Sequence, residues 1–180
     1  MPKRILSIRI TTKLYSIDIV SAYAPGEHLP EKDKDQFWKK LQQHIAQTPN
    51  RTQPIIGIDA NGHIGKITHI PNIYPVGSTK WTQNGSIMSQ ICCRYNLMVT
   101  NCQIACKHPG PTWWGYSGTV STKVDYILIP LRLGGGIKNN IGADPKLDLN
   151  RQGSPTDHIP VRCTFTIPIY MQQYLSLIHI

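Results

Sequence analysis

Acidic residues are scarce in this 180-residue chain. Ten Asp and Glu stand against 19 Lys and Arg, which leaves a formal net charge of +9 and a pI near 9.4. An excess of that size favours polyanionic partners, because cationic side chains release counterions from phosphate backbones. Charge alone does not identify a nucleic-acid-binding protein, since many basic domains bind no nucleic acid.

The chain also lacks a long apolar run. Its first residues, MPKRILSIRI, alternate between apolar and polar side chains instead of forming the continuous apolar core of a signal peptide. No stretch reaches the length of a transmembrane helix. We therefore expect a protein that is neither secreted nor membrane-bound and that works inside the cell, with the nucleus as a suitable compartment.

The five cysteines lack the paired C-x-x-C spacing that zinc sites favour. Cys92 and Cys93 are adjacent, and Cys102 and Cys106 are four residues apart. In an intracellular protein, an odd number of cysteines without paired spacing indicates reduced thiols.

What the chain does contain is typical of one globular domain. Hydrophobic residues make up 40% of it, and 180 residues can bury a substantial core. Helical spacing of apolar residues predicts helices at 31–46 and 84–96. Alternating or short apolar runs predict strands at residues 4–10, 14–25, 53–59, 97–101, 111–118, 122–130 and 158–167. The short polar link at 11–13 predicts that the first two strands form a hairpin, and the strands at 111–118 and 122–130 are expected to pair. Residues 131–154 are rich in Gly, Asn and Asp and are expected to be mostly irregular. The predicted fold class is α+β, with stacked sheets flanked by helices.

Four polar clusters each stand at the end of a predicted strand: Tyr23 in SAYAP, Asp59 and Asn61 in GIDANGH, Asp125 in KVDYILIP, and Asp157 with His158 in PTDHIPV. Each has an ordinary explanation when taken alone. Asp-x-Asn before glycine is common turn chemistry, and the other residues suit packing or capping roles. Together they supply oxygen ligands for Mg²⁺ and a group that moves protons, which are the parts that phosphodiester cleavage needs.

The order Y-A-P, D-x-N-G-H-x-G, T-W-W, V-D-Y-I-L and D-H resembles the endonuclease/exonuclease/phosphatase (DNase I-like) superfamily, which includes DNase I, exonuclease III and the abasic-site endonucleases. The pattern is most similar to endonuclease domains of non-LTR retrotransposons and to craniofacial-development-protein-2-like proteins, where SAYAP precedes an acidic helix with a Phe-Trp pair, here Phe37-Trp38. The match runs from about Ile5 to Phe165. It implies a four-layer α/β-β/α sandwich with its active site at one rim.

The resemblance also implies roles for individual residues. Asp59 would position or deprotonate the attacking water, and Asn61 would hold that nucleophile and a phosphate oxygen. Asp125 would orient His158, whose other ring nitrogen addresses the scissile phosphate. Tyr23 would donate a hydrogen bond to the phosphate, and Trp113 or Trp114 would lie near the DNA. Asp157 would bind Mg²⁺ (or Mn²⁺) directly or contact the groups that do. For one of the two tryptophans, packing in the hydrophobic core is at least as favoured as a contact with DNA. His63 is interpreted as a residue that supports the structure and not as part of the site.

Two elements of the family pattern are missing. The family begins with a strand that carries an Asn and a later segment that ends in a metal-binding Glu, whereas Glu27 and Glu31 follow the YAP motif here. The resemblance therefore implies a sandwich that lacks its first strands and helix, within a partial domain at residues 1–168. Losing the glutamate would lower the rate by roughly 10²–10⁴. Ile58 is a milder departure, because the family usually has glycine before this Asp.

Residues 169–180 are assigned to a tail. Its closing LSLIHI is either a translated sequencing adapter or a natural C-terminal end, and we give it no weight in the fold.

Three functions are compatible with the sequence. The first is a Mg²⁺-dependent DNA endonuclease of the retroelement type, impaired by the missing ligand. The second is a catalytically inactive remnant that binds nucleic acid or a protein. The third is a phosphoesterase for a small or lipid phosphoester. The basic charge and the SAYAP and Phe-Trp motifs favour DNA.

Overall fold

The computed structural model describes residues 4–65, 81–103, 106, 110–115, 119–138, 141–144 and 157–167. The elements in chain order are β1 (Ile5–Thr11), β2 (Ser16–Tyr23), α1 (Glu31–Ala46), β3 (Thr52–Asp59), α2 (Gln83–Arg94), β4 (Leu97–Val99), the 3₁₀ helix η1 (Thr100–Cys102), β5 (Trp113–Trp114), β6 (Ser121–Thr122), β7 (Asp125–Pro130), the 3₁₀ helix η2 (Leu131–Gly136), β8 (Gly142–Ala143) and β9 (Val161–Arg162).

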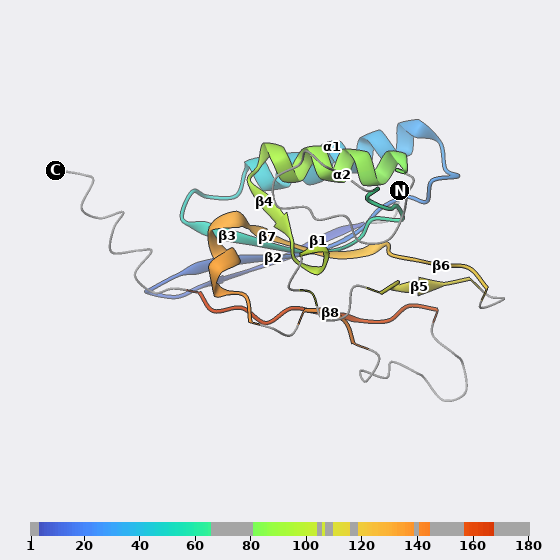
Figure 1. The fold of residues 1–180 in the computed structure, drawn as a ribbon. Coiled ribbons are helices and arrows are strands. Elements are labelled where there is room, and N and C mark those ends of the chain that lie inside the picture. The colour runs from blue at the N-terminus through green and yellow to red at the C-terminus, as the bar shows by residue number, and fades with distance from the viewer. Residues whose placement is uncertain are drawn as a thin grey trace, which may run out of the picture.

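The main sheet has five strands in the order β1-β2-β3-β7-β4. β1 and β2 form the predicted antiparallel hairpin. β2 and β3 are parallel, and α1 is the crossover between them, as a parallel connection requires. Both helices cover one face of the sheet, while the pairs β5-β6 and β8-β9 lie on the other side (Figure 1). The result is the mixed α/β layering that the sequence predicts.

Helix α1 has the predicted bounds because its apolar residues recur at helical spacing. Phe37, Trp38, Leu41 and Ile45 are buried on one stripe, and the opposite face carries exposed charges. Glu31 and Asp33 in the first turn complement the positive end of the helix dipole. The helix therefore presents a continuous apolar face to the sheet below it.

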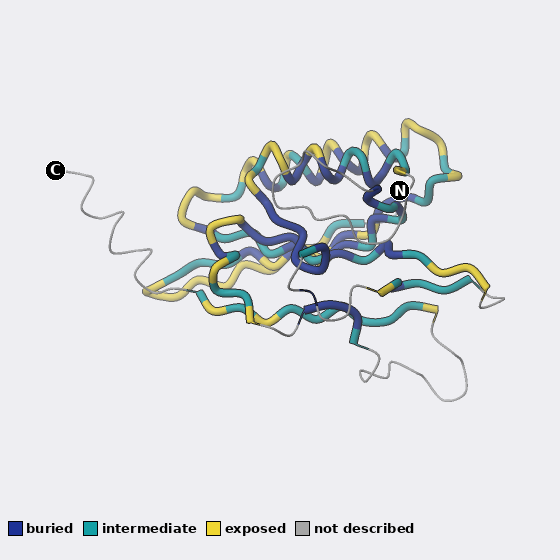
Figure 2. The backbone as a smooth tube through the Cα atoms, viewed as in Figure 1, coloured by how far each residue is buried: buried dark blue, intermediate teal, exposed yellow. Residues whose placement is uncertain are grey.

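The principal core fills the space between the helices and the sheet (Figure 2). Its largest fully buried side chains include Trp38, Leu41, Ile56, Met88, Ile91 and Leu128. A second, smaller cluster lies on the other face of the sheet, where Met98, Ile129 and Leu133 are buried with partly buried Phe165 and neighbours. Residues on β3 and β7 alternate between the two clusters, and this alternation fixes which side chains of these strands face away from the helices.

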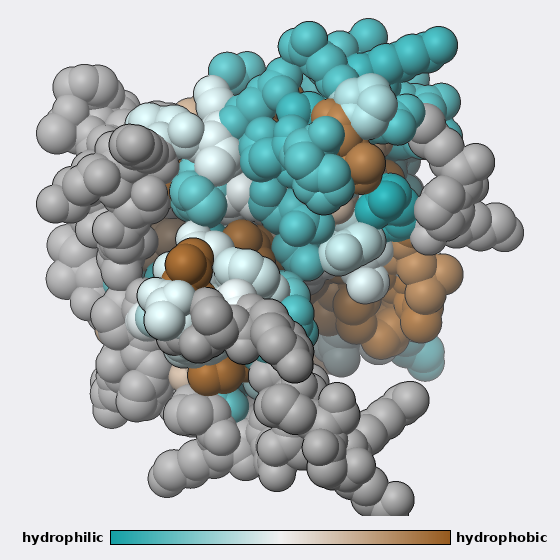
Figure 3. Space-filling model, turned by 90° about the vertical axis from the view of Figure 1, so that its right-hand side faces the viewer, coloured by the Kyte–Doolittle hydropathy of each residue, from teal (hydrophilic) through white to brown (hydrophobic). Residues whose placement is uncertain are grey.

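In the part of the chain that the structure describes, β1 is the edge strand of the main sheet, and most of it is exposed. Leu6, Ile8 and Ile10 are 67%, 62% and 44% exposed, and Ile19, the register partner of Ile8 on β2, is 45% exposed. These four side chains share the face of the sheet that the helices do not cover. Figure 3 shows hydrophobic surface gathered below the hydrophilic helix surface at the right of the view.

Several predicted strands are shorter or paired differently than the pattern suggests. Of the predicted strand at 111–118, the structure describes residues 111–115, and within these β5 is the one strand; it pairs with β6, whereas β7 enters the main sheet between β3 and β4. The closing strand is reduced to β9 and two isolated bridges, at His158 and Phe165. Within 131–154, η2 and β8 form where irregular chain was expected. The tail at 169–180 lies outside the described residues.

Two further expectations concern features of the whole chain. All five cysteines are free thiols, as their spacing indicates. Among the described residues, no helix is both long enough and apolar enough to cross a membrane.

Candidate active site

Three neighbouring strands each place one polar residue at the same end of the main sheet. Tyr23 of β2 is in register with Asp59 of β3, and Asp59 is in register with Asp125 of β7. Residues in register project from the same face, so these side chains form a row. Their chain neighbours point the other way, into the core beneath the helices: Ala22, Ile58 and Tyr126. The row therefore lies on the face opposite the helices.

Asp59 and Asn61 form the turn that ends β3. The backbone N–H of Asn61 donates to Oδ1 of Asp59 at 2.9 Å, and Asn61 has φ 44°, a left-handed conformation that Asn tolerates better than most residues. The Asn61 side chain reaches across to the segment that follows β2, where its Nδ2 donates to the carbonyl of Ala24 at 2.8 Å. Asp59 and Asn61 can therefore form the turn that ends β3 and still belong to the candidate site.

His158 is bound to Asp125. Its Nδ1 lies 2.9 Å from Oδ2 of Asp125, with the His158 side chain 37% exposed and that of Asp125 23% exposed. His158 is also bridged to Trp113 of β5 through backbone pairing. The carboxylate orients the ring and leaves Nε2 as the atom that can face a substrate, the arrangement that the sequence resemblance implies.

Asp59, Asp125 and His158 converge. One potential ligand atom from each lies within 4.8 Å of the others, the one such group among the described residues. The pKa of the Asp59 carboxyl is raised from 3.8 to about 6, chiefly because the group is buried; the Asn61 hydrogen bond and the charge of His158 oppose the increase, and the charge of Asp125 adds to it. The negative charge of Asp59 is thus incompletely compensated, which suits either a proton or a cation beside it.

Asp157 lies beside this group. Its Oδ2 accepts a hydrogen bond from Nε1 of Trp113 at 3.1 Å, and its carbonyl accepts from the backbone N–H of Trp114 at 2.8 Å. The Asp157 charge contributes to the raised pKa of Asp59, so the two carboxylates are electrostatically coupled. Both tryptophans are half-buried. Trp113 therefore connects Asp157 with His158, while Trp114 makes its contact through the backbone.

Tyr23 is 53% exposed. The guanidinium of Arg4 lies over its ring, 5.2 Å from the centroid. His63, in contrast, is held through its ring, whose Nδ1 lies 2.9 Å from Oγ1 of Thr122. That bond agrees with the structural interpretation of His63.

Three residues that the sequence did not single out hold the Asn61 loop in place. Asn84 is fully buried, and its Nδ2 donates to the carbonyls of Pro25 at 2.8 Å and Asn61 at 3.4 Å. The hydroxyl of Tyr126 donates to the carbonyl of Gly62 at 3.2 Å. Thr82 accepts from the backbone N–H of His63 at 3.0 Å and also caps α2.

The close approach of α2 to this loop requires glycine. A Cβ on Gly85 would collide with the backbone carbonyl of His63, and one on Gly62 would press on Thr82 and Asn84. Thr82 three residues before Gly85 is a recognisable helix cap, but nothing in the local sequence indicates that this helix end supports the Asn61 loop.

The two glutamates of the chain are occupied elsewhere. Glu27 Oε1 accepts from the backbone N–H of Asn84 at 2.8 Å, and its Oε2 lies 3.6 Å from the Lys34 ammonium. Glu31 accepts from the side chain of Gln83 at 3.0 Å. Neither belongs to the Asp59–Asp125–His158 group, in agreement with their position after the YAP motif.

No protein-family model matches the sequence, and the comparison with curated proteins gives no match. Solved structures do match. The endonuclease domain of TRAS1, a telomere-specific non-LTR retrotransposon, superposes with a TM-score of 0.63 at 18% identity, covering 91% of this chain and 64% of that one. The 3′ phosphatase NExo from Neisseria, bound to a product DNA hairpin, gives a TM-score of 0.62 at 18% identity, covering 89% and 65%.

An AP endonuclease from Archaeoglobus fulgidus gives a TM-score of 0.60 at 17% identity, covering 84% of this chain and 62% of that one. These similarities establish the fold. The chain has the DNase I-like fold that the order of its motifs predicts, and it spans slightly less than two thirds of the length of each of these structures.

Proposed function

We propose that this chain is a divalent-metal-dependent phosphodiester hydrolase that acts on DNA, of the retroelement endonuclease type. The observation that carries the proposal is the convergence of Asp59, Asp125 and His158, with potential ligand atoms within 4.8 Å of one another at one end of the sheet. The formal charge of +9 favours a polyanionic substrate. Solved structures with this fold include enzymes that act on DNA.

Asp59 is the proposed general base. A pKa of about 6 leaves its carboxylate ionised at neutral pH while keeping it basic enough to take a proton from an attacking water. Asn61 is fixed beside it by the turn, so its amide can orient that water or a phosphate oxygen. Tyr23, next in the row, would donate its hydroxyl to the phosphate.

His158 is proposed to address the scissile phosphate through Nε2. The bond between its Nδ1 and Asp125 keeps the proton on Nδ1 and stabilises the ring if it becomes charged. Protonated, the ring would donate to the oxygen that gains charge as the phosphodiester bond breaks. Trp113 and Trp114 would form the wall of the substrate site on the β5 side.

The residues present fit a hard divalent cation, Mg²⁺ or Mn²⁺. Asp59 and Asp125 offer partly buried carboxylates, the charge of Asp59 is incompletely compensated, and Asp157 adds a third carboxylate nearby. Such an ion would neutralise charge on the phosphate. No glutamate joins this group, since Glu27 and Glu31 are bound elsewhere. We therefore propose weak metal binding and a correspondingly reduced rate.

The test is nicking of supercoiled plasmid with Mg²⁺, comparing the chain with its Asp59→Ala and Asp35→Ala variants. Asp35 is an exposed carboxylate on α1 and serves as the matched control. We expect slow nicking that Asp59→Ala abolishes and Asp35→Ala leaves intact. Equal nicking by all three proteins, or none by any, would exclude the proposed hydrolase.

The occupied glutamates favour a second candidate, a binding module without catalysis. DNA binding in the absence of any Asp59-dependent turnover would support it. A third possibility, hydrolysis of a lipid or other small phosphoester, would be indicated by turnover of those substrates and not of DNA.

A further inference from the structure

Arg4 continues the row of site residues across the sheet. The backbone N–H of Tyr23 donates to the carbonyl of Arg4 at 2.9 Å, which extends the β1–β2 register by one pair beyond Ile5 and Ala22. Arg4 is therefore opposite Tyr23, as Tyr23 is opposite Asp59. Residues paired in this way share a face, so Arg4 lies on the side of the sheet that carries the site.

The Arg4 side chain is held in a defined place. Its guanidinium carbon lies 5.2 Å from the centroid of the Tyr23 ring, and its Nη1 donates to the Tyr23 carbonyl at 3.4 Å. A guanidinium carries five N–H donors, so this bond leaves most of them available. Among the described residues, no carboxylate forms an ion pair with Arg4.

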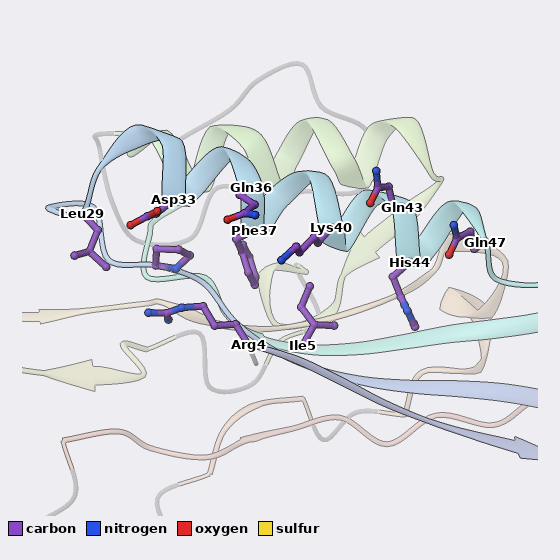
Figure 4. Close-up of a pocket in the computed structure, with 11 residues that line it drawn as sticks. Arg4, Ile5, Leu29, Asp33, Gln36, Phe37, Lys40, Gln43, His44 and Gln47 are labelled. Carbon is purple, nitrogen blue, oxygen red and sulfur yellow. The ribbon is translucent and has the colours of Figure 1, made fainter. Parts of the chain in front are cut away.

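The guanidinium also borders open space. A groove of about 470 Å³ runs between the start of β1 and helix α1. Figure 4 shows Arg4 extending toward the Leu29 end of this groove, with Phe37 and Lys40 along its length. The groove lies on the helix side of the sheet, and none of the site residues lines it. Arg4 stands at the end of the sheet between this groove and Tyr23, so its charge borders open space beside the row of site residues.

The spacing suits a nucleic-acid strand. Neighbouring strands of a sheet are about 4.8 Å apart, so Arg4 lies two strand spacings, roughly 10 Å, from the column of Asp59. Phosphates follow one another by about 3.4 Å of rise per nucleotide in B-DNA. A strand cleaved at Asp59 would therefore present a second phosphate to Arg4 within about three nucleotides of the cleaved one.

We propose that Arg4 is a substrate-binding residue that holds a backbone phosphate within about three nucleotides of the cleaved bond while fixing the Tyr23 ring beneath it. This inference rests on the proposed function, because it takes DNA as the ligand. A planar guanidinium suits both tasks, since it stacks on the aromatic ring and presents parallel N–H donors to phosphate oxygens.

The test is the salt dependence of DNA binding, measured by fluorescence anisotropy of a labelled duplex in EDTA so that no cleavage occurs. The proteins compared are the full chain and its Arg4→Ala, Arg4→Lys and Arg51→Ala variants. Arg51 is exposed at the other end of β3, eight residues from Asp59, and is the matched control for lost charge. Thermal melting of each variant checks that the fold is retained.

Arg4→Ala is expected to raise Kd about three- to tenfold and to reduce the slope of log K against log salt by about 0.9, the value of one lost phosphate contact. Arg4→Lys should keep the slope, because it keeps the charge, and Arg51→Ala should match the original chain. If the original chain binds DNA and Arg4→Ala binds with the same slope, the Arg4 assignment is overturned and the proposed function stands. If the original chain binds no DNA, both are overturned.

Discussion

The backbone N–H of Asn61 is bonded to the carboxylate of Asp59, 2.9 Å away, across the turn that ends β3. This bond fixes both side chains at once: Asp59 is held with one oxygen engaged, and Asn61 is held in a left-handed conformation with its amide bonded to the neighbouring strand. The turn that ends β3 therefore also holds the two residues proposed to bind the attacking water. Substitutions at Asn61 can separate what its backbone conformation contributes to stability from what its side chain contributes to activity.

Asn61→Gly and Asn61→Ala form a matched pair for this purpose. Glycine accepts a φ of 44° without strain, whereas alanine pays about 1–2 kcal/mol for it. Both variants lose the amide that bonds to the Ala24 carbonyl. We expect urea denaturation to show Ala less stable than Gly by about 1 kcal/mol, and plasmid nicking to fall equally in both. Activity retained by Asn61→Gly would mean that the amide has no catalytic part.

Asp59 makes stability depend on pH. Its folded-state pKa of about 6 is above its ordinary value of 3.8, so the folded chain is penalised when the carboxylate is ionised. The penalty is complete above pH 6 and disappears as the pH falls toward 4. Asp59→Asn should therefore be more stable than the original chain at pH 8, by on the order of 1–2 kcal/mol after allowing for solvent screening of a part-exposed group.

The measurement is urea denaturation of both proteins in EDTA at pH 8 and at pH 4. The difference in unfolding free energy should shrink at the lower pH. Asp35→Asn, at an exposed position, should show no such change. An equal difference at both pH values would show that the Asp59 carboxylate does not titrate in this range.

Asp125 and His158 are expected to act as a unit. His158→Gln should reduce the nicking rate by about 10²–10⁴, the usual contribution of a positioned proton-transfer group. Asp125→Asn should reduce it through the loss of ring orientation, because the 2.9 Å bond to Nδ1 is weakened. In the double variant the losses should be far from additive. Additive losses would show that the two residues act independently.

Asn84 is expected to stabilise the fold by pairing with buried polar groups. Asn84→Ala removes the acceptor of the buried Trp38 Nε1–H, 2.8 Å away, and the donor to the Pro25 carbonyl. Leaving such groups unpaired should cost about 2–3 kcal/mol in unfolding free energy. Gln90→Ala, on an exposed position of the same helix, is the control and should change little. A loss under 0.5 kcal/mol would mean that the network is not maintained in solution.

Much of this fold was predictable because it is encoded locally. The apolar spacing of Phe37, Trp38, Leu41 and Ile45 predicts α1, and the alternation on either side of residues 11–13 predicts the β1–β2 hairpin. The candidate site residues were proposed from the order of their motifs along the chain, and the structure brings Asp59, Asp125 and His158 together. What could not be predicted is register. Nothing local places Tyr23, Asp59 and Asp125 opposite one another, because that depends on which strands pair.

Other features depend on tertiary contacts between distant segments. Asn84 looks like an ordinary polar residue near a helix start, and its burial beneath the Asn61 loop follows only from how α2 packs. The tryptophan strand was expected to be longer, but β5 has two residues and pairs with β6 rather than with β7. Strand propensity alone cannot choose between partners when both segments alternate.

The exposed edge of β1 is expected to make this protein prone to self-association. Among the described residues no strand pairs with the outer side of β1, and Leu6, Ile8 and Ile10 are uncovered on one face, so β1 is a template for β-pairing between chains. The time over which a solution stays monodisperse would then be set by how often two such edges meet, so it would shorten as the protein is concentrated. Ile8→Lys would place a charge at the centre of that edge and slow the association, and it lies outside the Asp59–Asp125–His158 group.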